Sequence, residues 1–276
     1  MEWNILKAAA SFASFSGLGA SLIMASIVII VIQHKGNDKP LHALALFIVT
    51  LAAMALDTFV FASATGDKIC ARATTQGLIA SSTLAVAIAV IALGVSWLVS
   101  TLDDCPPYLR LLSSVVAALG SVGAFSILVL WSIYYYKGLV RLELRPGPIW
   151  PFSYALIPIG VFLGLTALVI GLGLRRKGRG RAIVFCTICY MSHVIAVMLA
   201  YVATFVVPGE WWASAPATFD EWMLTGVYAV TLVFPMIELV AVVASLDWRP
   251  WRPPLTDDGL PMQRFSEEQL AEHMAT

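Results

Sequence analysis

Charged side chains are scarce in this chain of 276 residues. Only 12% of the residues are Asp, Glu, Lys or Arg, while 59% are hydrophobic. A soluble domain typically has about 25% charged and about 45–50% apolar residues. The 17 basic and 17 acidic residues balance, so we expect no basic surface for nucleic acid. The surplus of apolar side chains needs a non-aqueous solvent, which indicates the lipid bilayer as a partner.

Histidine and cysteine are also rare, at four residues each. Four histidines are too few for the His-rich sites of desaturases and haem carriers. Cys186 and Cys189 form a CxxC, a motif that often serves redox or metal chemistry. Because this pair lies inside an apolar run and no second CxxC accompanies it, we interpret both as small buried cysteines. No metal or nucleotide motif is present, so no metal and no cofactor is predicted.

Long apolar runs fill most of the chain. They lie at 8–32, 41–64, 73–99, 108–136, 149–174, 182–207 and 222–246. Each is longer than the ~20 residues that a helix needs to cross the hydrocarbon of a bilayer. The runs lack the short alternating pattern of a membrane barrel, the other structure that satisfies the backbone in lipid. The sequence therefore predicts an all-α, polytopic membrane protein with a bundle of seven transmembrane helices.

The predicted seven-helix domain covers residues 1–248, and residues 249–276 form a polar tail. Within that tail, Ser266 and Gln269 are spaced as a capping box, which predicts a short helix. Lys and Arg gather on cytosolic loops, and the basic cluster at 175–181 favours an N-terminus outside or in the lumen. The tail is then cytosolic.

Small residues recur at four-residue spacing within several runs. Examples are Gly17 and Ser21 in the first run, and Gly160 and Gly164 in the fifth. Such spacing lets helix backbones approach closely in membranes. We expect these positions to mark helix contacts.

Three ionisable side chains lie deep in the predicted helices: Asp57, His193 and Glu238. Each costs at least ~2.5 kcal/mol at the centre of a membrane helix, which makes each a candidate for function. From the helical rise, the two acids lie roughly 12 Å apart in depth. An apolar site favours the neutral, protonated form of a carboxyl group, which suits proton donation. The alternative, that these side chains are hydrogen-bonded packing residues, stays open, most of all for His193.

Polar and aromatic residues share helix faces with these three side chains. Thr50, Met54, Asp57 and Phe61 align on the second run, and Cys186, Tyr190, His193, Tyr201 and Thr204 align on the sixth. On the last run, Pro235 precedes Glu238 by one turn and is expected to loosen the helix. We expect a cavity among these three helices. The aromatic rings expected to bind substrate and stabilise cations there are Phe61, Trp131, Tyr190 and Tyr228.

In topology, in size and in the placement of Asp57 and Glu238, the chain resembles the seven-helix terpene cyclases of fungal and bacterial natural-product pathways. The resemblance covers the topology and these two positions. It implies that the two acids start and end the cyclisation of a prenyl or epoxyprenyl chain. The expected function is then an intramembrane acid–base enzyme that acts on a lipophilic small molecule.

Two other classes of function stay open. A proton-coupled transporter or channel would use Asp57, His193 and Glu238 as a relay. The sequence has no detectable internal repeat and no run interrupted at its middle, which are features of many transporters. A seven-helix receptor is the third possibility, whereas the absence of Lys from the last run excludes a retinal protein.

Overall fold

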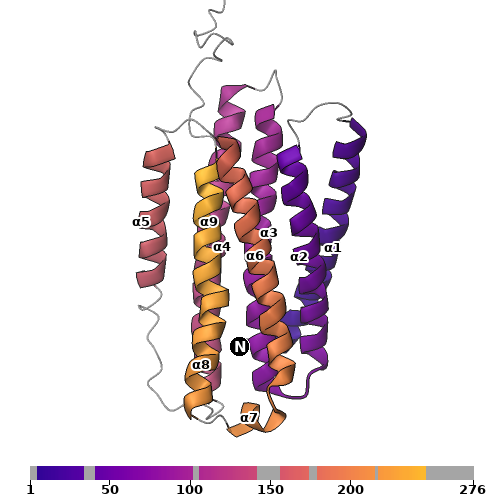
Figure 1. Ribbon diagram of the computed structural model, residues 1–276, viewed down its shortest axis with the longest axis vertical. Coiled ribbons are helices and arrows are strands. Elements are labelled where there is room, and N and C mark those ends of the chain that lie inside the picture. Colours follow the sequence, from indigo (N-terminus) through magenta and orange to yellow (C-terminus); the bar gives the residue numbers. More distant parts are fainter. Residues whose placement is uncertain are drawn as a thin grey trace, which may run out of the picture.

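Helices make up the computed structural model across the residues that it describes, which are 5–33, 41–101, 106–141, 156–173, 179–214 and 217–246. In chain order they are α1 (Ile5–Gln33), α2 (Leu41–Gly66), α3 (Cys70–Thr101), α4 (Pro107–Arg141), α5 (Leu156–Gly173), α6 (Arg179–Val206), α7 (Gly209–Ser214), α8 (Ala217–Tyr228), the π-helix η2 (Ala229–Val233) and α9 (Phe234–Ser245) (Figure 1). The predicted tail helix and Cys105 lie outside the described residues.

Six of the described helical stretches are long and apolar enough to cross a membrane. They are Ala9–Ile32, Leu41–Gly66, Cys70–Ser100, Tyr108–Val140, Ala182–Val206 and Thr225–Ser245. This agrees with the prediction of a multi-pass helical membrane protein. The fifth predicted run corresponds to α5, whose apolar stretch, Ile157–Ile170, is shorter. The seventh crossing therefore stays a prediction.

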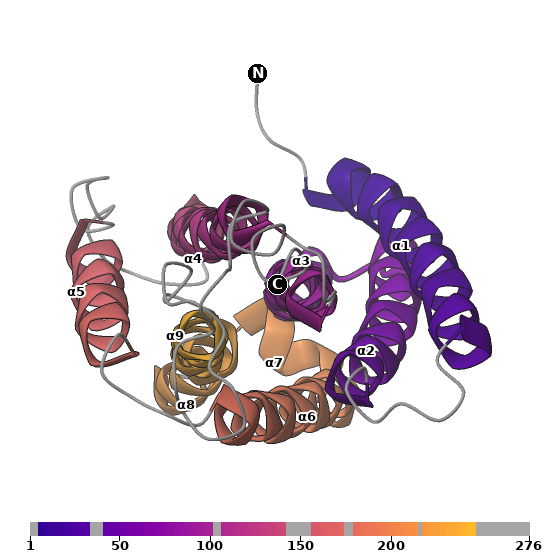
Figure 2. The same cartoon turned by 90° about the horizontal axis from the view of Figure 1, so that it is seen from above.

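Helix α3 lies at the centre of the bundle. Viewed along the bundle, α2, α4, α6 and α9 lie around it, α1 packs on α2, and α5 lies at the edge (Figure 2). Most of α3 is buried, including the small residues Ala85, Ala87 and Ala89. A helix that is apolar or small on all sides suits a central position, because each face meets a neighbouring helix.

The outward faces of the surrounding helices carry large apolar side chains. On α6 these include Ile188, Ile195 and Leu199, each more than half exposed. A soluble protein rarely exposes a continuous apolar surface of this kind. In a bilayer the same side chains contact lipid.

Glycine brings two pairs of helices close together. A Cβ atom on Gly94 of α3 would lie 2.8 Å from the ring of Phe47, and one on Gly19 of α1 would lie 2.6 Å from the sulfur of Met54. At Gly160 and Gly164, by contrast, an added Cβ would meet nothing within 4 Å among the described residues. The prediction that these two glycines mark a helix contact is wrong, because this face of α5 has no described neighbour.

Candidate functional site

The three predicted ionisable residues gather around two neighbouring residues of α3. Asp57 on α2, His193 on α6 and Glu238 on α9 are each at most 1% exposed. Asp57 Oδ1 forms a hydrogen bond with Thr83 Oγ1. His193 Nε2 lies 3.2 Å from Ser82 Oγ, and His193 Nδ1 lies 2.8 Å from Glu238 Oε2. We call these five side chains the central site.

The predicted helix faces explain this convergence. The α2 stripe (Thr50, Met54, Asp57, Phe61), the α6 stripe (Cys186, Tyr190, His193, Tyr201, Thr204) and the α9 residues Pro235 and Glu238 are all buried. The depth estimate that separated the two acids assumed helices starting at one level. In the structure, Thr83 of α3 bonds to Asp57, and its neighbour Ser82 contacts His193, which in turn contacts Glu238. Because Ser82 and Thr83 differ by only about 1.5 Å in helical rise, both acids lie near the same height along α3.

Hydrogen bonds at Thr83 define the protonation of Asp57. The Thr83 hydroxyl lies within hydrogen-bond distance of both Asp57 Oδ1 and the carbonyl oxygen of Ala80, the latter at 2.9 Å. A hydroxyl has one proton to donate, and a carbonyl oxygen can only accept. Both bonds form at once when Thr83 donates to Ala80 and a protonated Asp57 donates to Thr83. The arrangement therefore suits a neutral Asp57.

The same reasoning applies to His193. Ser82 Oγ donates to the carbonyl oxygen of Ile79 at 2.7 Å, so it accepts from His193 Nε2–H. The second ring nitrogen, Nδ1, faces Glu238. A proton between Nδ1 and Oε2 gives either imidazole with a carboxylic acid or imidazolium with a carboxylate. Both arrangements keep the hydrogen bond from Nε2–H to Ser82.

The two carboxyl groups thus have different partners. Asp57 faces a neutral hydroxyl, whereas Glu238 faces an imidazole that can carry a charge. Their second oxygens, Asp57 Oδ2 and Glu238 Oε1, are buried without a hydrogen-bond partner among the described residues. The site can therefore present a proton donor and a separate proton acceptor.

The four predicted aromatic residues are not all at this site. Tyr190 is fully buried and lies within electrostatic range of both Asp57 and Glu238. Phe61 and Trp131 come together through Phe12, whose ring centroid lies 5.4 Å and 5.3 Å from theirs. Tyr228 instead lies against Tyr135, with ring centroids 6.5 Å apart, in a separate apolar cluster.

The last membrane helix is interrupted close to Glu238. The π-helix η2 separates α8 from α9, and the N–H of Phe234 donates to the carbonyl oxygen of Ala229, five residues earlier. Pro235 follows and has no N–H of its own. Loosening of the helix at Pro235 was predicted from the sequence, whereas the π-helix was not. Single π-turns of this kind are frequent at functional sites.

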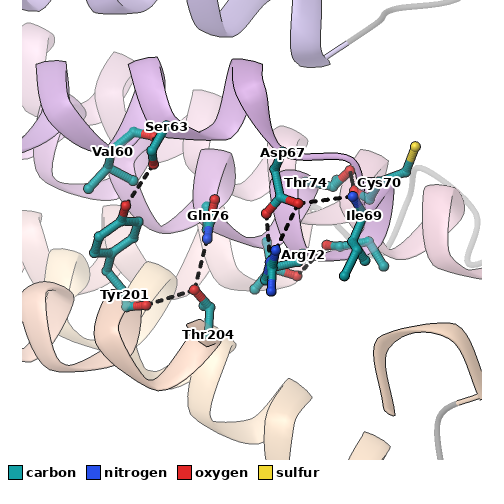
Figure 3. Close-up of polar contacts among 12 residues, drawn as sticks. Val60, Ser63, Asp67, Ile69, Cys70, Arg72, Thr74, Gln76, Tyr201 and Thr204 are labelled. Carbon is teal, nitrogen blue, oxygen red and sulfur yellow. Dashed lines mark hydrogen bonds and ion pairs between the residues drawn. The ribbon is translucent and has the colours of Figure 1, made fainter. Parts of the chain in front are cut away.

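A second group of buried polar residues lies nearer to the turn between α2 and α3 (Figure 3). Gln76 Nε2 donates to Thr204 Oγ1 at 2.9 Å, and Tyr201 Oη lies 2.7 Å from Ser63 Oγ. At the turn itself, Arg72 forms an ion pair with Asp67 at 2.6 Å. Gln76, Ser82 and Thr83 are not among the residues predicted for the site from the sequence. The polar run Ser81–Thr83 inside the most buried helix was the signal for two of them.

Fold and site together define a multi-pass helical membrane protein with a buried acid–base cluster. The chain matches no protein-family model, no curated protein and no solved structure.

Proposed function

We propose that this protein is an intramembrane acid–base enzyme that isomerises a lipophilic, prenyl-type substrate, in the manner of the terpene cyclases that it resembles. The observation that carries the proposal is the difference between the two buried carboxyl groups. The hydrogen bonds of Asp57 suit a neutral acid, while Glu238 shares a proton with His193. Environments that separate two titratable groups in this way commonly assign the roles of acid and base.

In the proposed reaction, Asp57 donates its proton to an alkene or epoxide of the substrate. The acid O–H bond breaks, and the proton bonds to an alkene carbon as the π bond breaks, or to the epoxide oxygen as a C–O bond breaks, so that a carbocation results. Aromatic faces beside the site, of which Tyr190 is one candidate, stabilise the cation. The cation closes a ring, and Glu238 Oε1, which has no hydrogen-bond partner among the described residues, accepts a proton from carbon to leave an alkene. Return of that proton to Asp57 completes the cycle, so the product has the mass of the substrate.

The proposal includes seven crossings, with α5 as the fifth and with the N-terminus outside or in the lumen. A seven-helix bundle places its termini on opposite faces of the membrane. The turn between α2 and α3, which holds Asp67 and Arg72, then lies on the non-cytosolic side.

The test compares membranes that contain wild type or Asp57→Asn after feeding with a prenylated precursor, using mass spectrometry. We expect a new product of unchanged mass with wild type, and at least about a hundredfold less with Asp57→Asn, since general acid catalysis contributes about 10²–10⁴-fold. In D₂O the product of alkene protonation should gain one deuterium on carbon, because the acid proton of Asp57 exchanges with solvent between turnovers, whereas epoxide protonation places the deuterium on an exchangeable hydroxyl.

Asp67→Asn is the matched control, because it makes the same chemical change in an acid that pairs with Arg72 away from the central site. Its product yield should stay close to that of wild type. Identical profiles for wild type and Asp57→Asn, in both solvents and with epoxidised precursors as well, would refute the enzyme.

A proton-coupled transporter is the second candidate, and the interrupted last helix favours it. Discontinuous helices commonly form the substrate and ion sites of transporters. The sequence pattern shows no interrupted helix, which counts against a transporter. In the structure, however, η2 interrupts the last membrane helix between α8 and α9. Acidification inside liposomes that depends on an added small molecule, and is lost in Glu238→Gln, would favour the transporter over the enzyme.

A further inference from the structure

Four helices repeat one order of residues between the central site and the α2–α3 end of the bundle, where Gly66 and Cys70 lie. Moving toward that end, each helix has a polar residue, then an apolar residue, then a second polar residue. On α2 the order is Asp57, Val60, Ser63; on α3 it is Ser82, Ile79, Gln76; on α6 it is His193, Val197, Tyr201; and across α9 and η2 it is Glu238, Pro235, Thr231.

The spacing places these residues on successive turns of each helix. Each step is three or four residues, which separates consecutive side chains of a series by roughly 5 Å along the helix and turns them by at most about 60° around it. Hydrogen bonds join the helices above and below: Thr83 and Ser82 at the central site, then Ser63 to Tyr201 and Gln76 to Thr204. The helices therefore run side by side over this whole stretch.

We call Val60, Ile79, Val197 and Pro235 the apolar layer. All four are buried, and the three aliphatic side chains are at most 1% exposed. We call Ser63, Gln76, Tyr201 and Thr231 the second polar level. Along each of these helices, one buried apolar residue lies between two polar residues.

The second polar level contains hydrogen-bonding capacity that the protein does not use. The Thr204 hydroxyl donates to the carbonyl oxygen of Tyr201 at 2.7 Å, so it accepts from the amide of Gln76 and thereby fixes the amide orientation. Gln76 Oε1 then has no partner among the described residues, and neither does Thr231 Oγ1. Figure 3 shows the Gln76 oxygen pointing away from Thr204. Buried polar atoms of this kind are normally satisfied by water or ligand.

This level lies one turn from the polar end of the bundle. Arg72 precedes Gln76 by four residues, its side chain is 20% exposed, and it is paired with Asp67. On the opposite half of α3, Val86, Ala89, Val90 and Leu93 are buried and apolar, and Ser96 nearer that end is buried and polar. Between the central site and the α2–α3 end, polar side chains with unused hydrogen-bonding capacity are separated from the site by one apolar residue on each helix.

We propose that water and protons reach the central site from the α2–α3 end, and that the apolar layer is the gate on this route. Pro235 lies in the layer and directly follows η2, so the interrupted helix is the part that can open it. A hydrophobic constriction between polar chambers gates by wetting and dewetting. The inference concerns access to the site and draws its meaning from the proposed proton-transfer function.

The test measures how fast silver ions, which are close to water in size, react with a thiol at the central site. Ser82→Cys is introduced into protein in which Cys70, Cys105, Cys186 and Cys189 are replaced by alanine. The orientation of the protein in the vesicles is determined with a separate variant that keeps only Cys70, which is exposed beside the α2–α3 turn. An impermeant maleimide labels Cys70 only where this end of the bundle faces the outside of the vesicle. Silver is then added outside vesicles of either orientation.

We expect reaction from the α2–α3 end and far slower reaction from the other end. Val197→Ala in the apolar layer should speed the reaction by about tenfold, which corresponds to roughly 1.4 kcal/mol. Val60→Ala tests the same layer from another helix, in case one variant folds poorly. Val90→Ala, an equally buried valine of α3 on the far side of the site, is the matched control and should leave the rate unchanged.

Equal rates from both ends, no reaction in any variant, or equal acceleration by Val90→Ala and Val197→Ala would each overturn the gate. Because the assay measures access and not turnover, its failure would leave the proposed enzyme standing. Conversely, if silver reacts faster from the α2–α3 end and the apolar-layer variants speed the reaction, but no cyclised product forms, the gate is supported and the proposed enzyme function is refuted.

Discussion

Asp57, inside α2, and Asp67, directly after α2, show how a hydrogen-bond partner influences the charge of a carboxyl group. Asp57 lies in the bundle centre against the Thr83 hydroxyl, and because that hydroxyl has one proton and also contacts the carbonyl oxygen of Ala80, the arrangement suits a protonated Asp57. Asp67 lies at the end of α2, where it accepts from the Arg72 guanidinium at 2.6 Å and 3.0 Å and from the N–H of Ile69 at 2.9 Å. The first is suited to donate a proton and the second to hold a charge.

Asp67 gives a prediction about pH. Partial burial raises the pKa of Asp67, but the hydrogen bonds from Arg72 and Ile69 lower it by more, so the pKa lies below its ordinary value of 3.8. When a native pKa is lowered, the added stability is complete above the unfolded-state pKa and is lost as pH falls through the native pKa. We expect Asp67→Asn to lower the free energy of unfolding by about 0.5–1 kcal/mol near neutral pH.

Thermal melts of wild type and Asp67→Asn in detergent, recorded from pH 7 downward, test this expectation. The difference between the two proteins should be constant down to about pH 5 and shrink below the ordinary pKa of aspartate, near 3.9. A difference that grows on acidification would contradict the assigned role of the pair.

At this scale the sequence identified the acids and missed their partners. Asp57, His193 and Glu238 stand out because charge in lipid is costly. Ser82 and Thr83 do not, because hydroxyls in membrane helices usually bond to their own backbone, as Thr50 and Ser121 do. Which hydroxyl also meets a partner on another helix depends on packing, which no single run of sequence contains.

Among the elements, the last membrane helix departs most from its sequence pattern. The apolar run 222–246 predicts one continuous helix, and its composition does span α8, η2 and α9. Pro235 accounts for a loosened turn. The π-helix before Pro235 adds a residue to one turn and so rotates α8 relative to α9. Residue propensities in the sequence do not distinguish a π-helix at this position from a simple kink.

The contact between α2 and α3 supplies a prediction at the scale of elements. Gly94 lies against the ring of Phe47, which is itself buried and cannot easily move. Gly94→Ala should therefore destabilise the protein by about 1–3 kcal/mol, the usual effect of overpacking a core. Thermal unfolding in detergent is the measurement.

Gly123→Ala on α4 is the control, because a Cβ there would meet nothing within 4 Å. Alanine exceeds glycine in helix propensity by about 0.8–1.0 kcal/mol, so this variant should be neutral or slightly more stable. A Gly94→Ala protein that melts like Gly123→Ala would show that α2 and α3 do not approach as closely as described.

In the whole molecule, two interhelical hydrogen bonds constrain the path of the chain. Thr75 on the first turns of α3 bonds to Tyr135 near the end of α4 at 2.9 Å. Gln76, its neighbour, bonds to Thr204 near the end of α6. Both α4 and α6 therefore end at the α2–α3 end of the bundle, and α6 begins at the opposite end.

The proposed seven crossings require one crossing between α4 and α6, which fits the positions that these two bonds give to α4 and α6. Helix α5 is the one helix described there; its 18 residues span about 27 Å at 1.5 Å per residue, close to the ~30 Å of hydrocarbon. It packs on α9 and α4, with Phe162 stacked on Phe125 at 4.5 Å. These contacts support the proposal that α5 is a seventh crossing, whereas length and hydropathy identify six candidate spans among the described helices.

The corresponding experiment labels single cysteines in otherwise cysteine-free protein with an impermeant maleimide in sealed vesicles. Arg145→Cys, before α5, should be labelled from the same face as Cys70, whereas Gly178→Cys, after α5, should be labelled from the opposite face. In intact cells, labelling of Cys70 without permeabilisation would further support an N-terminus outside. If Arg145→Cys and Gly178→Cys react from one face, α5 does not cross, and the hydrogen bond of either Tyr135 or Thr204 to α3 must be absent in the membrane.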